Sequence, residues 1–249
     1  MPLARAQLES LLRTRQLDRT LTTALPIPDE TLVAPTGVAA VDALVGGGLP
    51  RGQISELVGP RSSGRTSLAL QMLRAATARG ELVALVDALD MLDVDSAAAA
   101  GIDLARVLWV RGHVVSNPGL CRDMNQRALE QAIRALALVL QAGNFGLVVL
   151  DVAEAPPDAV RRLPFTTWLR LQRMVEGSQT ICVLVGSETM ARSSAGLTVR
   201  TGMRDWGAGM KFGHRLFEGL SVQARVVRAR ARTQEDAVVA LTTVATNCA

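Results

Sequence analysis

The sequence has almost no lysine and few cysteines, and both shortages limit what the protein can be. Among its 27 basic residues Lys211 is the one lysine, so arginine carries nearly all of its positive charge. The three cysteines, Cys121, Cys182 and Cys248, are odd in number and show no spacing typical of metal ligands. The sequence therefore predicts neither a disulfide framework nor a zinc site, and it suits a reducing compartment.

Long apolar runs are also absent. The first ten residues contain no apolar stretch of signal-peptide length, and nowhere do about 18 apolar residues follow one another without interruption. We therefore expect a soluble, cytoplasmic protein with no membrane partner.

The overall composition is that of one folded domain. With 249 residues, 49% of them apolar and 20% charged, the chain can bury a large core, which excludes a disordered protein. Its formal net charge of +4 is too small to identify a nucleic-acid partner without knowing where the charges lie.

The N-terminal part differs from the rest of the chain. Residues 3–20 carry leucines at helical spacing with polar residues between them, which predicts an amphipathic helix within a segment spanning 1–23. Residues 24–36 contain three prolines and cannot continue that helix, so we interpret them as a linker. The predicted core domain is 37–249.

Within that domain, short apolar runs alternate with longer helical stretches. We expect strands at 54–59, 82–87, 106–110, 147–151 and 180–185. We expect helices over about 64–80, 125–142 and 166–176. The strand runs are apolar at nearly every position, which is typical of parallel strands covered on both faces. After residue 220 the alternating pattern predicts an antiparallel hairpin that closes one sheet edge, so the fold class is α/β with a mainly parallel sheet flanked by helices.

A glycine-rich loop stands between the first of these strands and the first helix. It has the spacing G-x-x-x-x-G-x-T, in which backbone amides wrap a phosphate at the positive end of a helix. The residues expected to bind nucleotide here are Gly59, Ser62, Ser63, Gly64, Arg65 and Thr66. The usual lysine is replaced by Arg65, whose planar guanidinium cannot take the same place unless the loop moves. ATP with magnesium is therefore expected to bind weakly or not at all, although Arg65 has the alternative explanation of a general shortage of lysine.

Asp151 ends the fourth predicted strand. An aspartate there is typical of a magnesium-binding strand end, and with the Thr66 hydroxyl it would hold Mg²⁺ if a nucleotide binds. The alternative is that Asp151 caps the turn that follows.

These motifs carry a family resemblance. Residues 35–73 read PTGVAAVDALVGGGLPRGQISELVGPRSSGRTSLALQML, with a threonine–glycine start, a GGLPRG turn and the phosphate loop. The stretch resembles the RecA recombinase family, and the similarity continues more weakly to about residue 245. The segments LWVR, FTTWLRLQR and ICVLVGSETMARSSAGLTVR most resemble the ImuA branch, the RecA-like members of bacterial mutagenesis cassettes. The resemblance implies a RecA-like P-loop core.

The chain departs from the family pattern at several functional positions. The glutamate that activates the attacking water in RecA-type enzymes is Leu89 here, and a general base contributes typically 10²- to 10⁴-fold to a rate. The aromatic residue that stacks on adenine is Ser96, while the aspartate three residues before it is kept as Asp93. The glutamine that senses the γ-phosphate falls at about Ser187. We therefore expect that none of these altered positions acts in catalysis.

The DNA-contacting loops implied by the resemblance are contracted. A short VAEAPPDAVRRLPFTTWLR stretch follows Asp151, and the second loop, near ETMARSSAGL, is also short. Arg161, Arg162 and Arg192 remain beside these loops, either as phosphate or partner contacts or as solvated surface residues.

Positive charge is concentrated late in the chain. Residues 200–232 contain eight basic residues against two acidic ones. Arg228 and Arg230 alternate on one predicted strand face, and by resemblance they match cations that reach a neighbouring subunit's nucleotide. Binding of phosphates by such a face would be independent of sequence and sensitive to salt. The alternative is an edge strand whose arginines prevent aggregation.

Together these features predict an accessory factor of damage-induced mutagenesis and translesion synthesis. By resemblance its partners would be RecA, an ImuB-type polymerase homologue and an error-prone DNA polymerase, at the bacterial nucleoid, with DNA as a further partner to consider. One alternative is a divergent DNA-dependent ATPase with strand-exchange activity, in which Glu188 or Asp90 replaces the missing glutamate. Another is a non-specific DNA-binding module.

Overall fold

The computed structural model describes residues 32–112, 122–203, 221–229 and 237–242. The predicted N-terminal helix, most of the predicted linker, and Arg230 lie outside these ranges. No helix among the described residues combines the length and apolar character needed to cross a membrane.

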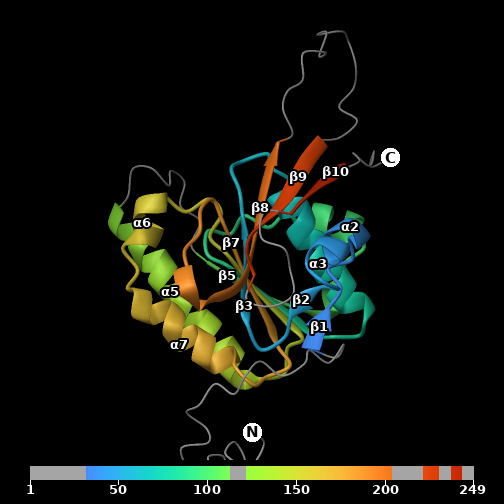
Figure 1. The fold of residues 1–249 in the computed structure, drawn as a ribbon. Helices are drawn as coiled ribbons and strands as arrows, with labels where there is room; N and C mark the ends of the chain where they lie inside the picture. Colours follow the sequence, from blue (N-terminus) through green and yellow to red (C-terminus); the bar gives the residue numbers. More distant parts are fainter. Residues whose placement is uncertain (1–31, 113–121, 204–220, 230–236, 243–249) are drawn as a thin grey trace, which may run out of the picture. The chain divides into compact units, whose positions relative to one another are not determined.

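An eight-stranded sheet forms the centre of the described domain, with the strand order β10-β9-β8-β3-β7-β6-β4-β5 (Figure 1). The strands are β3 (Ile54–Val58), β4 (Val83–Asp87), β5 (Val107–Arg111), β6 (Leu147–Asp151), β7 (Ile181–Gly186), β8 (Ala195–Met203), β9 (Ser221–Ala229) and β10 (Val238–Thr242). The pairs from β8 to β5 are parallel, whereas β9 and β10 are antiparallel additions at one edge. The predicted mainly parallel α/β fold with an edge hairpin is confirmed. A small second sheet pairs β1 (Val33–Ala34) with β2 (Leu49–Pro50).

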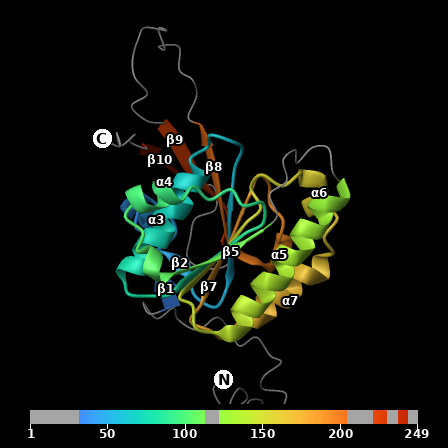
Figure 2. The same ribbon diagram turned by 180° about the vertical axis from the view of Figure 1, so that it is seen from behind.

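Helices cover both faces of the central strands (Figures 1 and 2). On one face lie α2 (Ala39–Leu44), α3 (Arg65–Ala78) and α4 (Val94–Ala99); on the other lie α5 (Arg122–Ala142), α6 (Pro157–Arg161) and α7 (Phe165–Val175). Strands β3, β4 and β7 are buried at every position, which explains their unbroken apolar runs. Each face has its own apolar cluster, so the sheet is held between two cores.

The sequence analysis missed strand β8. It expected a contracted loop near residues 188–197, but the strand already begins at Ala195 and the connecting segment includes a short 3₁₀ turn, Arg192–Ser194. The buried Glu56 carboxylate fixes this segment: the amides of Met190 and Ala191 each donate to Oε1 at 2.7 Å, and Thr198 Oγ1 donates to Oε2 at 2.9 Å. These contacts join residues more than 130 positions apart, so no local pattern could have indicated them.

Candidate phosphate-loop site

The candidate site lies where the parallel strands β3, β4, β6 and β7 end, the usual position of ligand sites in open α/β sheets. The loop from Gly59 to Gly64 leaves β3 and enters α3, with Gly64 as its N-cap at φ +81°. A side chain is strained at such a φ, so glycine suits this position. The predicted strand–loop–helix arrangement is therefore present.

The loop packs closely on β8. Ser63 is buried, and its Oγ lies 2.8 Å from Thr201 Oγ1. A Cβ on Gly59 would lie 2.5 Å from the Thr201 carbonyl oxygen, so this position also requires glycine. Contact with Thr201, which the sequence analysis did not single out, therefore helps to set the shape of the loop.

Arg65 occupies the position of the usual lysine but is buried, with 4% of its surface exposed. Its Nη1 donates to the carbonyl oxygen of Gly59. Its Nη2 donates to the Ala153 carbonyl at 3.3 Å and to Glu154 Oε1 at 2.8 Å. The guanidinium is thus held by the protein's own oxygens, between the start of the loop and the turn after β6.

Thr66 and Asp151, the two predicted magnesium ligands, have different surroundings. Thr66 is exposed in the first turn of α3. Asp151 ends β6, and its Oδ1 accepts a hydrogen bond from the amide of Ala153 at 2.8 Å, as a turn-capping aspartate does. Burial raises the pKa of Asp151 to about 6, and the neighbouring Asp87 carboxylate on β4 adds to the rise.

Leu89 belongs to the apolar cluster on the α5–α7 face and is 4% exposed. The two carboxylates considered as substitutes for a general base are both engaged by arginine. Asp90 binds Arg111 through two hydrogen bonds of 2.8 Å, and Glu188 binds Arg161 at 2.5 Å. Each of these carboxylates thus has an arginine partner in this structure.

Asp93 and Ser96 form a helix cap. Asp93 is the N-cap of α4; it accepts a hydrogen bond from the amide of Ser96 at 3.1 Å and another from the Ser96 hydroxyl. These bonds lower the pKa of Asp93. Both residues line a broad cleft of about 1010 Å³ bounded by α3, α4 and the β9–β10 hairpin. A local capping role therefore accounts for Asp93 without a nucleoside.

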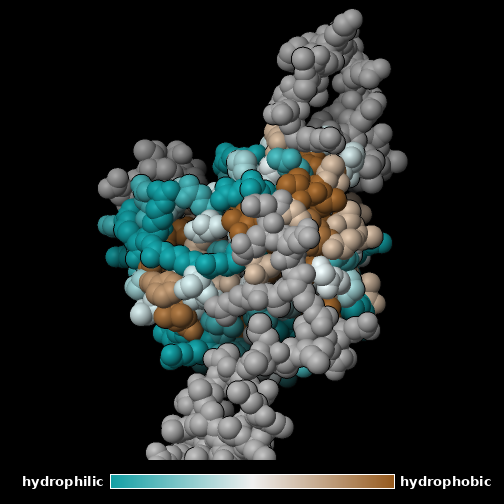
Figure 3. Space-filling model, viewed as in Figure 1, coloured by the Kyte–Doolittle hydropathy of each residue, from teal (hydrophilic) through white to brown (hydrophobic). Residues whose placement is uncertain are grey.

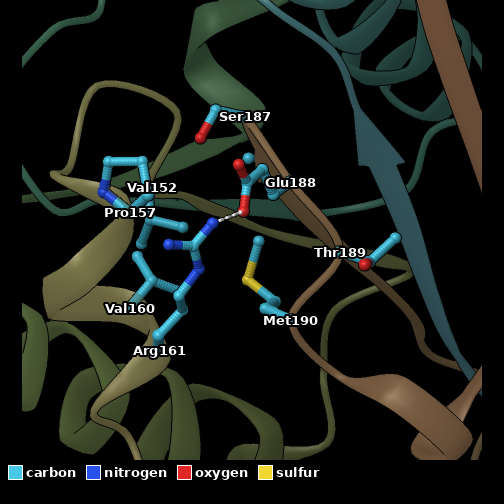
Figure 4. A pocket seen from close by; sticks show the side chains of 9 residues that line it. Val152, Pro157, Val160, Arg161, Ser187, Glu188, Thr189 and Met190 are labelled. Atoms are coloured by element: carbon cyan, nitrogen blue, oxygen red, sulfur yellow. Dashed lines mark hydrogen bonds and ion pairs between the residues drawn. The ribbon is translucent and has the colours of Figure 1, made fainter.

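Ser187 lies at a small hollow beside the ends of β6 and β7, where Arg161 and Glu188 point toward each other (Figure 4). The Glu188 carboxylate raises the pKa of Arg161. Next to Arg161, Arg162 donates from Nε to the carbonyl of Asp158 at 3.1 Å. Both arginines are thus tied to nearby oxygens.

Comparison of the chain with known proteins identifies its family. The RecA N-terminal domain model matches residues 28–160, more than half of the chain. The chain belongs to the RecA N-terminal domain family. Protein RecA of Salinispora tropica is 39% identical over 132 residues, which are 52% of this chain and 34% of that protein. Protein RecA of Leifsonia xyli subsp. xyli is 40% identical over 129 residues, 51% of this chain and 32% of that protein.

The chain thus spans about a third of the length of the curated relatives it matches. Among solved structures, that of the RadB recombinase is similar with a TM-score of 0.59 and 18% identity, over 84% of this chain and 94% of that one. This likeness concerns the fold. The predicted resemblance to the RecA family is confirmed by the family match.

In this chain, the residues at the phosphate loop and at the general-base position do not fit a hydrolytic centre for ATP and magnesium. The cation of the loop is paired with Glu154, and the position of the expected base is an apolar residue in the core. Of the two predicted magnesium ligands, Asp151 is already engaged by the amide of Ala153, and Thr66 is exposed on α3.

Within the described part of the basic segment 200–232, arginines on β8 and β9 form a basic sheet face. Arg200 on β8 and Arg225 on β9 are cross-strand partners and both are exposed. Arg228 is also exposed and donates from Nη1 to the carbonyl oxygen of Arg192, so the structure brings these two predicted contact residues together. Figure 3 shows hydrophobic residues gathered over β9 and β10, where Val227 and Val238 are exposed. The sequence analysis counted Arg200 and Arg225 in the basic segment but gave them no role.

Proposed function

We propose that this RecA-family chain is an ImuA-type accessory factor of SOS mutagenesis and translesion synthesis, and that it works by binding other proteins. Its proposed partners are RecA, an ImuB-type polymerase homologue and an error-prone DNA polymerase, in the cytoplasm at the nucleoid. In this proposal the N-terminal segment 1–23, the linker 24–36 and the core 37–249 act as one binding protein.

The observation that carries the proposal is the state of the cation in the phosphate loop. Arg65 is buried and ion-paired with Glu154 at 2.8 Å, so the charge that would attract a triphosphate is already compensated. A family member with a compensated loop and no general base keeps the RecA-like shape without the means of cleaving ATP. Such a shape suits docking to RecA or to proteins that bind RecA.

The test is co-sedimentation with RecA filaments assembled on single-stranded DNA with a non-hydrolysable ATP analogue. We expect the chain to sediment with the filaments, and the Thr66→Ala variant to sediment equally, because binding does not depend on the chain's own phosphate loop. In parallel, the chain alone should show no ATP hydrolysis above background with single-stranded DNA and magnesium. DNA-stimulated hydrolysis that disappears in Thr66→Ala, or failure to bind RecA and both cassette proteins, would contradict the proposal.

The basic sheet face favours DNA as a second candidate partner. Arg200 and Arg225 stand directly opposite each other and both are exposed, so two cationic side chains lie side by side on this face. Phosphates along a DNA strand are the anions that such a pair would bind, whatever the base sequence.

The double variant Arg200→Ala/Arg225→Ala is expected to weaken binding of single-stranded DNA severalfold at low salt. It should also reduce the slope of log K against log salt concentration by about 1 to 1.5, the value for two lost phosphate contacts. Fluorescence anisotropy over a salt series measures both quantities. Arg134→Ala, which removes an exposed arginine from α5, is the matched control and should leave the slope unchanged. An unchanged slope in the double variant would exclude this face as the DNA site.

A further inference from the structure

Two arginines at the phosphate loop, Arg61 and Arg65, share the carboxylate of Glu154. Glu154 Oε1 binds Arg65 Nη2 at 2.8 Å, and Oε2 accepts from Arg61 Nε at 2.7 Å and from Arg61 Nη2. Arg61 is at the outer side of the loop with 80% of its side chain exposed, whereas Arg65 is buried inside. Glu154 therefore joins the outside of the loop to its interior.

The same carboxylate fixes the loop to the turn after β6. Arg65 donates to the carbonyl oxygens of Gly59, at the beginning of the loop, and of Ala153, next to Glu154. Because these acceptors belong to two different strand ends, the guanidinium bridges β3 and β6. On the other side of the loop, Ser63 is bonded to Thr201 of β8. The loop is thus tied to both neighbouring parts of the sheet without a ligand.

One donor of the Arg65 guanidinium has no acceptor among the described residues. Arg65 Nε is buried and makes no hydrogen bond to the rest of the described chain. A buried N–H without an acceptor is costly, and the first turn of a fourteen-residue helix has free amides, so both favour a negative charge beside Arg65. The Glu154 carboxylate, bound to Nη2 of the same guanidinium at 2.8 Å, supplies that charge.

We propose that Glu154 is an internal anion that closes the phosphate loop. Its carboxylate takes the place of a nucleotide phosphate as the counter-charge of Arg65, and it therefore excludes a triphosphate from the loop. The pairing also gives the loop a fixed shape in the absence of nucleotide. This inference rests on the proposed function, in which no nucleotide is turned over, and it adds the reason why the loop does not take one up.

Neutralising Glu154 should open the loop to anions from solution. Glu154→Gln keeps the size of the side chain and one acceptor oxygen but removes the negative charge that Arg65 and Arg61 share. We expect this variant to bind inorganic tripolyphosphate and Mg–ATP at least tenfold more tightly than the unaltered chain in isothermal titration calorimetry. The matched control is Glu188→Gln, which breaks the Arg161 pair outside the loop and should bind as weakly as the unaltered chain.

A second measurement keeps the inference testable if Glu154→Gln folds poorly. The unfolding temperature of the Arg200→Ala/Arg225→Ala variant, which lacks the proposed DNA face, should be the same in tripolyphosphate and in sodium chloride of equal ionic strength, because Arg65 already has a counter-charge. A rise in tripolyphosphate alone, or equal affinity of the unaltered chain and Glu154→Gln, would overturn the inference. Neither result would affect co-sedimentation with RecA, so failure of this inference and failure of the proposed function are distinguishable.

Discussion

Replacing Glu56 by alanine should lower the free energy of unfolding by about 3–5 kcal/mol, because three donors lose their acceptor and each buried polar group left unsatisfied costs about 1–3 kcal/mol. The Glu56 carboxylate is 2% exposed and accepts hydrogen bonds from the amides of Met190 and Ala191 and from the hydroxyl of Thr198. Alanine leaves all three donors without an acceptor and leaves a cavity in the sheet. Urea denaturation followed by circular dichroism measures the loss.

Two comparisons separate this effect from a simple change of charge. Glu56→Gln keeps an oxygen acceptor for the two amides and should cost less, about 1–2 kcal/mol. Glu188→Ala removes an exposed glutamate from the same connecting segment and should change stability by less than about 1 kcal/mol. Equal losses in Glu56→Ala and Glu188→Ala would show that Glu56 does not anchor the segment.

The second large effect is expected at Asp151, where substitution should stabilise the protein. Burial raises the pKa of this carboxyl from 3.8 to about 6, so the folded state holds a proton that the unfolded chain releases more readily. Such a group contributes stability below pH 4 and loses it as the pH rises through 6. Asp151→Asn removes this penalty, and its amide oxygen can still accept the bond from Ala153. We expect a gain at pH 8 of at most about 3 kcal/mol.

The pH dependence of this stability gain shows whether ionisation of Asp151 causes it. The difference in unfolding free energy between Asp151→Asn and the unaltered chain should be small at pH 4 and about twice as large at pH 8 as at pH 5. Denaturant titrations at these three pH values provide the measurement. Asp158→Asn, at an exposed aspartate of α6, serves as control and should stay within about 0.5 kcal/mol at all three. A gain that does not vary with pH would assign the effect to something other than ionisation.

The sequence predicted the central fold well because the signals for it are local. Five apolar runs became β3 to β7, with their ends displaced by one residue or none, since strands buried on both faces show an unbroken apolar pattern. The strand β8 was missed because its preceding segment depends on Glu56, far away in the sequence. Apolar patterning cannot report a buried carboxylate that serves a distant loop.

The candidate site was predicted in outline and not in detail. The glycine spacing located the loop at the correct strand end, and the replacement of lysine by Arg65 was visible in the sequence. The direction of the guanidinium was not, because it depends on Glu154, which is 89 residues further along the chain. Likewise, the sequence offered Asp90 and Glu188 as replacements for the missing glutamate but could not show their pairing with Arg111 and Arg161.

The hydrogen bond between Ser63 and Thr201 connects the phosphate loop to distant parts of the fold. It connects the loop to β8, and β8 is in turn joined to the segment 187–194 through Glu56 and to the edge hairpin through β9. If the loop stays closed, as we propose, these connected parts keep one arrangement whether or not a partner is bound.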